Sequence, residues 1–269
     1  STITQQYLQN PACQREGCLP PRATIVPALR RGVTYRNHTA SACVTSLNGD
    51  FRFAYRAEDT IPDFFAMDYD DSGWDTIDVP SMWQYRGYGS PVYPNVEYPI
   101  PFDPPYVSCE NPVGYYRRRF TARKAARSVL YLGGVDSAYY LYLNGVFVGF
   151  AKGSRIPSEY DITDLLTDGE NLLCVKVFTY SDGTYLENQD MLLASGIFRD
   201  VLLVQTEALS VWDYEIVTRK DQVTVKVTLW DADYTNATVT VELDSRLTPA
   251  ANAQRYYKRY NKAKTARIE

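Results

Sequence analysis

The sequence predicts an all-β protein built from sandwiched sheets. Short apolar or alternating runs recur along the chain, with Gly, Pro, Asn or Asp between them, and no convincing long amphipathic helix interrupts them. The 23 Tyr, 10 Phe and 4 Trp also suit half-buried strands. At 269 residues the chain suits one large or two medium domains.

Charge, hydropathy and cysteine usage argue against several classes of protein. A net charge of −4 argues against a nucleic-acid surface. No run approaches the ~20 apolar residues of a membrane span, so no membrane partner is expected, and the first residues lack the features of a signal peptide. Five cysteines without a CxxC pair predict reduced thiols in a cytoplasmic protein. A lone histidine, His38, excludes a His-rich metal centre.

Residues 1–45 are predicted to form an extended arm, because they contain several prolines and little periodicity. A half-buried strand follows at 51–55, where Phe and Tyr alternate with Arg and Ala. Residues 57–75 suit a loop, and a short strand at 76–79 stops at Pro80. The segment 80–112 holds too many prolines for regular strands and too many aromatics for disorder, so it is predicted to be an ordered binding loop.

The stretch Ala138 to Thr163 is predicted to contain a central hairpin. Two apolar, Tyr-rich runs flank Asn144-Gly145, and Asn and Gly carry the lowest steric cost in a type I′ turn. Both faces of each run are apolar or aromatic, which indicates a sheet covered on both sides.

Further strands are predicted on both sides of the hairpin, at 114–121, 128–132, 171–180 and 201–204. The run Arg117-Arg118-Arg119 in the first of them is predicted to form a solvated basic face. Residues 181–200 are polar and punctuated by Gly, as in a loop.

Past Leu209, the runs 211–218, 222–230 and 237–243 alternate cleanly and predict a second, immunoglobulin-like sandwich. Such a domain needs ~100 residues, so 208–269 is predicted to be a partial one. Its basic end, from Arg246, shows no apolar stripe and is predicted to be a solvated or truncated terminus rather than a nucleic-acid tail.

Several long motifs in order resemble the N-terminal sugar-binding domain of family 2 β-galactosidases. They are VPSMWQYRGYGSPVYPNVEYPI, ENPVGYYRRRF, GVDSAYYLYLNGVFVGFAKGSRIPSEYDIT and YLENQDMLLASGIFRDV. The likeness covers roughly Ser46 to Val204, with weaker similarity in the arm at LQNP and LPPRA. It implies a jelly-roll sugar-binding domain at 46–207, then an immunoglobulin-like sandwich, and then a TIM barrel with the catalytic carboxylates.

The activity implied for a complete enzyme is retaining hydrolysis of terminal β-galactosides by two glutamates. Those glutamates lie in the barrel, which takes ~250 residues, so this chain alone is expected to be inactive. By resemblance, Asn95 and Asp190 reach the galactose-binding end of the active site. An amide and a carboxylate can together orient a sugar hydroxyl, which both donates and accepts.

The resemblance also implies two cations in the complete enzyme and none that this chain holds alone. Asp190 would help to ligate Na⁺, with the remaining ligands from the barrel. A Mg²⁺ site would lie between the arm and the first domain, where Asn10 and Asp182 suit it. Tyr7 and Lys152, however, stand where oxygen ligands are expected. An ammonium group cannot ligate Mg²⁺, so this site is not expected here.

Other polar residues of these motifs suit support better than chemistry. The carboxylates Glu187 and Asp182 could imitate an acid and a nucleophile, but loop capping and salt bridges are commoner uses. Ser154, Arg155 and Glu159 are predicted to form a polar network under the same loop.

Three functions remain open. The chain is a substrate-positioning portion of a β-galactosidase, a free-standing galactoside-binding module, or a subunit that completes an active site in trans. The module would need a cleft of its own, with a ring such as Trp83 or Tyr88 against the sugar.

Overall fold

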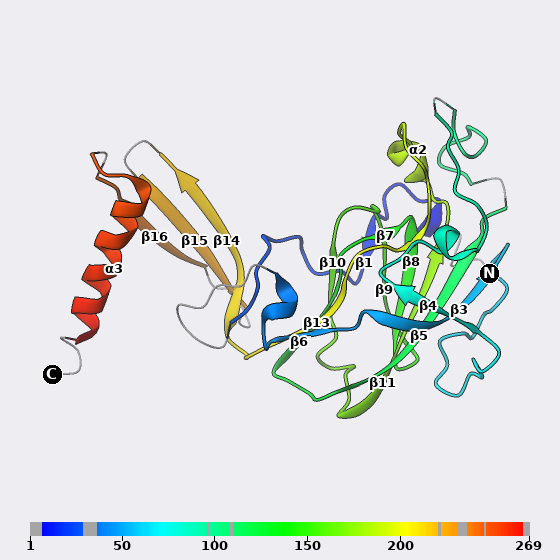
Figure 1. Cartoon of the computed structure of the whole chain (residues 1–269), viewed down its shortest axis with the longest axis horizontal. Helices are drawn as coiled ribbons and strands as arrows, with labels where there is room; N and C mark the ends of the chain where they lie inside the picture. The colour runs from blue at the N-terminus through cyan, green and yellow to red at the C-terminus, as the bar shows by residue number, and fades with distance from the viewer. Residues whose placement is uncertain are drawn as a thin grey trace. The chain divides into compact units, whose positions relative to one another are not determined.

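A computed structural model describes residues 7–28, 37–95, 97–107, 110–219, 222–230, 236–244 and 246–265. The chain forms two compact units (Figure 1). The first comprises 1–21 and 26–207, and the second comprises 22–25 and 208–269. The segment predicted to be an arm therefore contributes to both units.

The first unit is a sandwich of two antiparallel sheets, as predicted. The larger sheet has the order β1-β9-β8-β11-β5-β3-β4, with bounds Arg15–Glu16, Val146–Lys152, Ala138–Leu143, Gly169–Phe178, Val113–Ala122, Gly49–Arg56 and Asp75–Val79. The smaller has the order β10-β6-β13-β2, with bounds Ser158–Asp161, Arg127–Leu132, Val201–Thr206 and Val44–Ser46. Short elements complete the unit: β7 (Val135–Asp136) paired with β12 (Gly196–Ile197), α2 (Thr184–Glu187), η1 (His38–Ala40) and η2 (Trp83–Arg86).

Two hydrophobic clusters cover the two faces of the larger sheet. Alternate residues of β8 divide between them: Leu141 and Leu143 pack between the sheets, whereas Tyr140 packs on the outer face. Leu8 of the arm and Phe64 of the loop after β3 pack on this outer face. Because side chains of a strand alternate between its faces, this double burial explains why β8 is apolar or aromatic at every position. In β9, Val146 and Phe147 are exposed.

The predicted hairpin is confirmed as β8 and β9. Its turn residues, Asn144 and Gly145, have φ of 51° and 82°, the left-handed conformation that a type I′ turn requires. The Asn144 amide also donates to the Leu165 carbonyl at 2.9 Å and accepts from the Leu172 amide at 2.8 Å. The turn is thereby fixed to the neighbouring strand β11.

The arm adds β1 to the edge of the larger sheet, next to Gly149 of β9. A Cβ atom on Gly149 would contact the Glu16 carbonyl and approach the Tyr160 ring to 2.6 Å. We expect Gly149→Ala to lower the free energy of unfolding by about 1–3 kcal/mol, because overpacking forces backbone shifts. Urea denaturation checks this. Gly73→Ala, whose added methyl meets nothing within 4 Å, should stay within about 0.5 kcal/mol, and an equal loss in both variants would contradict the prediction.

The basic run on β5 differs from the prediction of a solvated face. Arg119 is exposed, but Arg117 is only 1% exposed. Its guanidinium donates to Asp71 at 2.7 Å and to the carbonyls of Phe64, Ala66 and Tyr69. The prediction is wrong for Arg117 because the loop after β3, far away in sequence, folds over this residue and supplies its partners.

The second unit contains the three predicted strands, which are confirmed as β14 (Ser210–Thr218), β15 (Gln222–Trp230) and β16 (Asn236–Glu242) in one antiparallel sheet. Trp212 and Trp230 meet edge to face at 4.8 Å. Arg22 lies over the Trp212 ring at 4.3 Å. The immunoglobulin-like character of this unit stays a prediction.

The basic end contains a long helix, α3 (Pro249–Thr265), which contradicts the expectation of no such element. Thr248 accepts a hydrogen bond from the Ala251 amide at 3.2 Å, as an N-cap does, and Pro249 suits the first helical position. Asn252 is buried and donates to the Asp244 carbonyl at 3.0 Å. Thr248-Pro249 was the sequence signal for a helix start. It was not recognised because the residues that follow show no apolar stripe.

Two further expectations concern cysteines and membranes. Cys13, Cys18, Cys43 and Cys174 have free thiols, as predicted, and Cys109 lies outside the described residues. None of the helices in the described ranges is long and apolar enough to cross a membrane.

Candidate functional site

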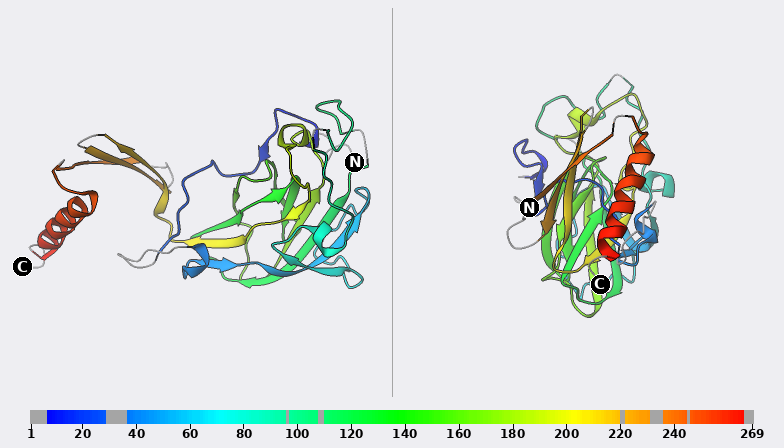
Figure 2. Two further views of the ribbon diagram at one scale, coloured as in Figure 1. Left: turned by 45° about the horizontal axis from the view of Figure 1, so that its top comes forward. Right: turned by 90° about the vertical axis from the view of Figure 1, so that its left-hand side faces the viewer.

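Two loops that are distant in sequence interlock at one end of the first unit. Val92 and Leu193 exchange backbone hydrogen bonds of 3.0 and 2.7 Å. The Asn188 amide donates to the Glu97 carbonyl at 2.9 Å. Figure 2 shows these loops and α2 projecting together from the sandwich. We call residues 91–95, 97–107 and 188–195 the rim.

The rim brings both predicted substrate-binding residues to the surface. Asn95 and Asp190 are exposed. The Tyr93 hydroxyl, two residues before Asn95, donates to the Asp190 carboxylate at 2.5 Å, and this bond raises the pKa of Tyr93. Asn95 has φ of 53°, a left-handed conformation that Asn tolerates better than most residues. The two polar side chains therefore belong to one linked surface, and neither is buried.

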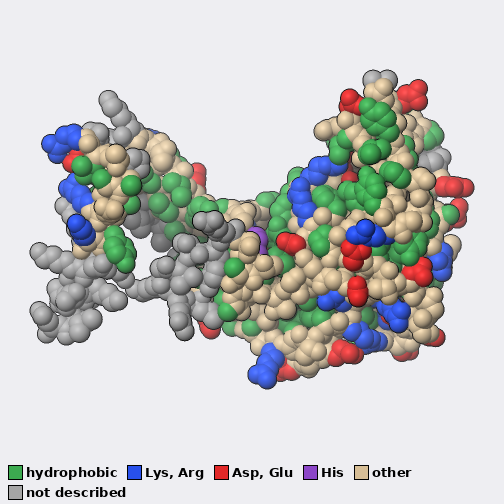
Figure 3. All heavy atoms as spheres, viewed as in Figure 1, with side chains coloured by type: hydrophobic (Ala, Val, Ile, Leu, Met, Phe, Trp, Pro, Cys, Tyr) green, Lys and Arg blue, Asp and Glu red, His purple; other side chains and the backbone are tan. Residues whose placement is uncertain are grey.

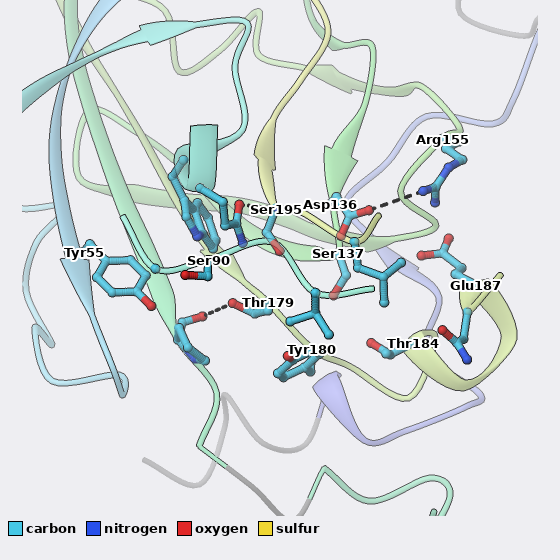
Figure 4. Close-up of a pocket in the computed structure, with 17 residues that line it drawn as sticks. Tyr55, Ser90, Asp136, Ser137, Arg155, Thr179, Tyr180, Thr184, Glu187 and Ser195 are labelled. Carbon is cyan, nitrogen blue, oxygen red and sulfur yellow. Dashed lines mark hydrogen bonds and ion pairs between the residues drawn. The ribbon is translucent and has the colours of Figure 1, made fainter. Parts of the chain in front are cut away.

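A pocket with about 630 Å³ of space, including its open mouth, is lined in part by rim residues such as Val92 and Leu193. Figure 4 shows Tyr55 at one end and Asp136, Arg155 and Glu187 at the other. Hydroxyl groups line the space between them, from Ser90, Ser137, Thr179, Thr184 and Ser195. A concave site with convergent polar groups and an aromatic wall suits a small polar ligand.

The acidic end of the pocket is held by a polar network. The Glu187 carboxylate accepts from the Ser154 amide at 2.8 Å and from the Ser154 hydroxyl at 2.6 Å. Arg155 lies 3.7 Å from Asp136. Burial, together with the nearby Glu187 charge, raises the pKa of Asp136 to about 7, although Arg155 opposes the shift. The predicted support is confirmed for Ser154 and for Arg155, which also donates to the Met191 sulfur at 3.6 Å. Glu159 lies in β10, paired with Tyr131 of β6.

Asp136 should make stability pH-dependent. An unfolded aspartate has a pKa of about 3.9, so between about pH 4 and pH 7 the folded state holds a proton that the unfolded state has released. The free energy of unfolding therefore falls as pH rises through that window. We expect Asp136→Asn to remove this fall and to stabilise the protein at pH 8 by up to about 4 kcal/mol.

Urea denaturation at low and high pH checks this expectation. The exposed Asp164 provides a control, and Asp164→Asn should leave the pH slope unchanged. An Asp136→Asn variant with the wild-type slope would contradict the assignment.

The two carboxylates that could imitate a catalytic pair, Asp182 and Glu187, have different partners. Both Asp182 oxygens accept from Lys152, at 2.7 and 2.9 Å, and both Glu187 oxygens accept from Ser154. Each carboxylate therefore has a supporting role, as predicted.

Of the two aromatic residues suggested from the sequence, one lines the pocket. Trp83 borders it, although it is only 1% exposed and also packs in the core, whereas Tyr88 packs against the Phe53 ring at 4.9 Å. Tyr55, which sequence reasoning missed, also borders the pocket. Its alternation with Phe51 and Phe53 indicated only a strand.

Exposed hydrophobic side chains gather on and beside the rim (Figure 3). They are Tyr93, Tyr98, Phe102, Tyr106, Leu186, Met191 and Leu192. Clusters of this kind on a protein surface commonly mark an interaction site.

A β-sandwich whose end loops carry a polar pocket is an architecture found in lectin-like domains. Residues 44–207 match the family model of the glycosyl hydrolases family 2 sugar binding domain. The chain belongs to this family. The predicted resemblance is thereby confirmed.

Curated relatives agree with this assignment. The β-galactosidase of Vibrio cholerae is 46% identical over 181 residues, which cover 65% of this chain and 18% of that protein. The β-galactosidase of Pectobacterium atrosepticum is 38% identical over 255 residues, which cover 90% of this chain and 24% of that protein. The chain thus spans about a fifth to a quarter of the length of these relatives.

Solved structures show the same fold. Bacteroides uniformis β-glucuronidase 2, covalently bound to cyclophellitol-6-carboxylate aziridine, has a TM-score of 0.54 at 18% identity, covering 74% of this chain and 26% of that chain. A β-glycosidase from Bacteroides vulgatus has a TM-score of 0.53 at 17% identity, covering 74% and 29%.

A second family model, for the NFACT N-terminal and middle domains, matches residues 189–269. This range includes the whole Ala208–Glu269 stretch of the second unit. The alignment with the Pectobacterium protein covers 90% of the chain and therefore also extends past Glu207. Part of the second unit is thus similar both to the NFACT family model and to the Pectobacterium β-galactosidase.

Proposed function

We propose that the first unit orients a β-galactoside for catalytic groups that belong to another domain. Family membership and relatives named β-galactosidase support this proposal. The observation that carries it is the rim, where Asn95 and Asp190 are exposed on interlocked loops. A side-chain amide and a carboxylate can together fix the direction of a sugar hydroxyl.

In this proposal the chemistry is retaining hydrolysis by two carboxylates about 5–5.5 Å apart, supplied in cis or in trans by a (β/α)₈ barrel. The residues that the structure describes form sandwiched sheets and no such barrel. Asp190 would also help to ligate a monovalent cation whose remaining ligands come from the barrel. The exposed hydrophobic residues of the rim suit a surface that the barrel covers.

The pocket favours a second candidate, a galactoside-binding module that works by itself. Its hydroxyl groups, carboxylates and Tyr55 ring offer the mixed polar and aromatic contacts that sugars use. In that case the ligand would lie against Tyr55 and Asp136 rather than at Asn95 and Asp190.

Calorimetric titration with galactose and lactose separates the two candidates. Substrate positioning predicts binding weaker than millimolar by this chain alone, since most contacts would come from the barrel. Millimolar or tighter binding that is lost in Tyr55→Ala and retained in Asp190→Ala would contradict our proposal and favour the galactoside-binding module.

We also propose a cytoplasmic location, because the four described thiols are free and disulfides are rare in reducing compartments.

A further inference from the structure

The side chain of Lys152 lies inside a cage of oxygen atoms. Its ammonium nitrogen donates to the Tyr7 carbonyl at 3.1 Å, to the Asn10 carbonyl at 3.0 Å, and to the two carboxylate oxygens of Asp182 at 2.7 and 2.9 Å. Only 1% of the lysine side chain is exposed. The oxygens come from two separate segments, the arm and the loop before α2, and the lysine stands at the end of β9.

This set of groups does not fit the divalent ion that the family resemblance implies. Mg²⁺ requires about six oxygen ligands at 2.0–2.1 Å, whereas the ammonium group, which only donates, fills the centre of the cage. The charges also balance without a divalent ion, because among the residues that the structure describes Asp182 alone gives Lys152 a carboxylate partner. No cluster of three or more His, Cys, Asp or Glu residues suited to a metal occurs among the described residues.

We propose that the Lys152 ammonium is the resident cation of this cage and does in this chain what a bound metal ion would do. The cage oxygens face inward and are spaced for a cation, and a buried ammonium needs such partners to offset its lost hydration. The proposal concerns residues of this chain alone and does not depend on the proposed function.

The lysine joins the arm to the loop that leads to the rim. Around the cage, the Asp182 amide donates to the Leu8 carbonyl at 2.9 Å and the Lys152 amide donates to the Gln14 carbonyl at 3.0 Å. Asp182 begins the segment that continues through Glu187 to Asp190. Holding Asp182 therefore fixes both the arm and the start of this functional loop.

Two substitutions of the lysine distinguish a cation site from ordinary packing. Lys152→Gln removes the charge and places an amide oxygen one bond short of the former nitrogen position, which leaves room for an ion there. Lys152→Met has a side chain of the same length as Gln, also one bond shorter than Lys, and offers neither charge nor oxygen. Both should lower Tm by roughly 10 °C in EDTA, because breaking a buried ion pair leaves the other charge uncompensated.

Thermal unfolding with excess EDTA, Mg²⁺ or Ca²⁺ is the test. Ca²⁺ is included because its ligand distances of 2.3–2.6 Å require less contraction of the cage. We expect the wild-type Tm to be the same in all three conditions. Lys152→Gln should regain at least half of its lost Tm with a saturable dependence on Ca²⁺ or Mg²⁺, whereas Lys152→Met should regain none.

Lys176→Gln is the matched control. Lys176 is also buried and paired with a carboxylate, Asp59 at 2.8 Å, but aromatic rings rather than carbonyl groups surround it. This variant should be destabilised without responding to either ion. An equal response in Lys176→Gln, or no response in Lys152→Gln, would overturn the proposal.

The wild-type protein supplies a second test, in which the lysine stays in place. Calorimetric titration of the wild-type protein with Mg²⁺ or Ca²⁺ should show no stoichiometric binding at the cage. Binding at the cage would be recognised by its loss in Asp182→Asn. Such binding would overturn the proposal, because a metal ion would then share the site with the lysine.

Discussion

Asp190→Ala should lower kcat/KM for a β-galactoside by about 10- to 150-fold when this chain replaces the matching segment of the Pectobacterium atrosepticum β-galactosidase. A hydrogen bond to a charged group contributes about 1.5–3 kcal/mol, and each 1.4 kcal/mol is about tenfold. The loss follows from poorer orientation of the sugar before attack. Steady-state kinetics with a chromogenic β-galactoside measures it.

Gln189 supplies the control for this prediction. It is the exposed neighbour of Asp190 on the same loop, so Gln189→Ala should change kcat/KM by less than about threefold, the scale of most surface substitutions. Tyr93→Phe, which removes the donor to Asp190, should fall between the two. An Asp190→Ala chimera as active as Gln189→Ala would contradict the role of Asp190.

Arg117→Met should lower the free energy of unfolding by about 3–5 kcal/mol, the cost of breaking a buried ion pair. The substitution leaves Asp71 without its cation and removes the arginine donor from the Phe64, Ala66 and Tyr69 carbonyls, of which Ala66 keeps a bond from the Tyr69 amide. Each buried polar group that loses its partner is costly, because water does not replace it. Urea denaturation followed by tryptophan fluorescence measures the change.

Arg119→Met is the same substitution two residues later on the same strand. Its ion pair with Glu170 is exposed on both sides, at 44% and 61%, and pairs of this kind contribute about 0–1 kcal/mol. Adding Asp71→Asn to Arg117→Met should recover part of the loss, since the uncompensated charge is gone. Equal losses in the two single arginine variants would show that Arg117 gains nothing from its buried partners.

The sequence predicted those parts of the fold that local patterns determine. The hairpin around Asn144-Gly145 followed from turn chemistry, and the longer strands of both units followed from alternation or apolar runs, whereas the short strands β1, β2, β7, β10 and β12 were not predicted. The strand Ser158–Asp161 was missed because its polar residues resemble a loop, although it pairs with β6 in the smaller sheet. Its partner strand, rather than its own composition, determines its structure.

Long-range contacts explain what sequence reasoning missed at the site. Asn95 and Asp190 were identified from motifs, yet only the structure shows that Tyr93 connects their loops. The burial of Arg117 depends on Asp71, and the raised pKa of Asp136 depends on the packing around β7. In each case the property depends on residues far along the chain or on burial of the side chain, and no local sequence pattern indicates either.

Reconstitution of hydrolysis is the most direct test of the central claim that this chain orients a sugar for catalytic groups it does not itself supply. β-Galactoside turnover is measured for this chain alone, for the remaining part of the Pectobacterium enzyme alone, and for the two joined in one chain. The account predicts turnover only in the joined protein, with its rate reduced by Asp190→Ala. Turnover by this chain alone, or a joined protein no more active than the Pectobacterium part by itself, would contradict it.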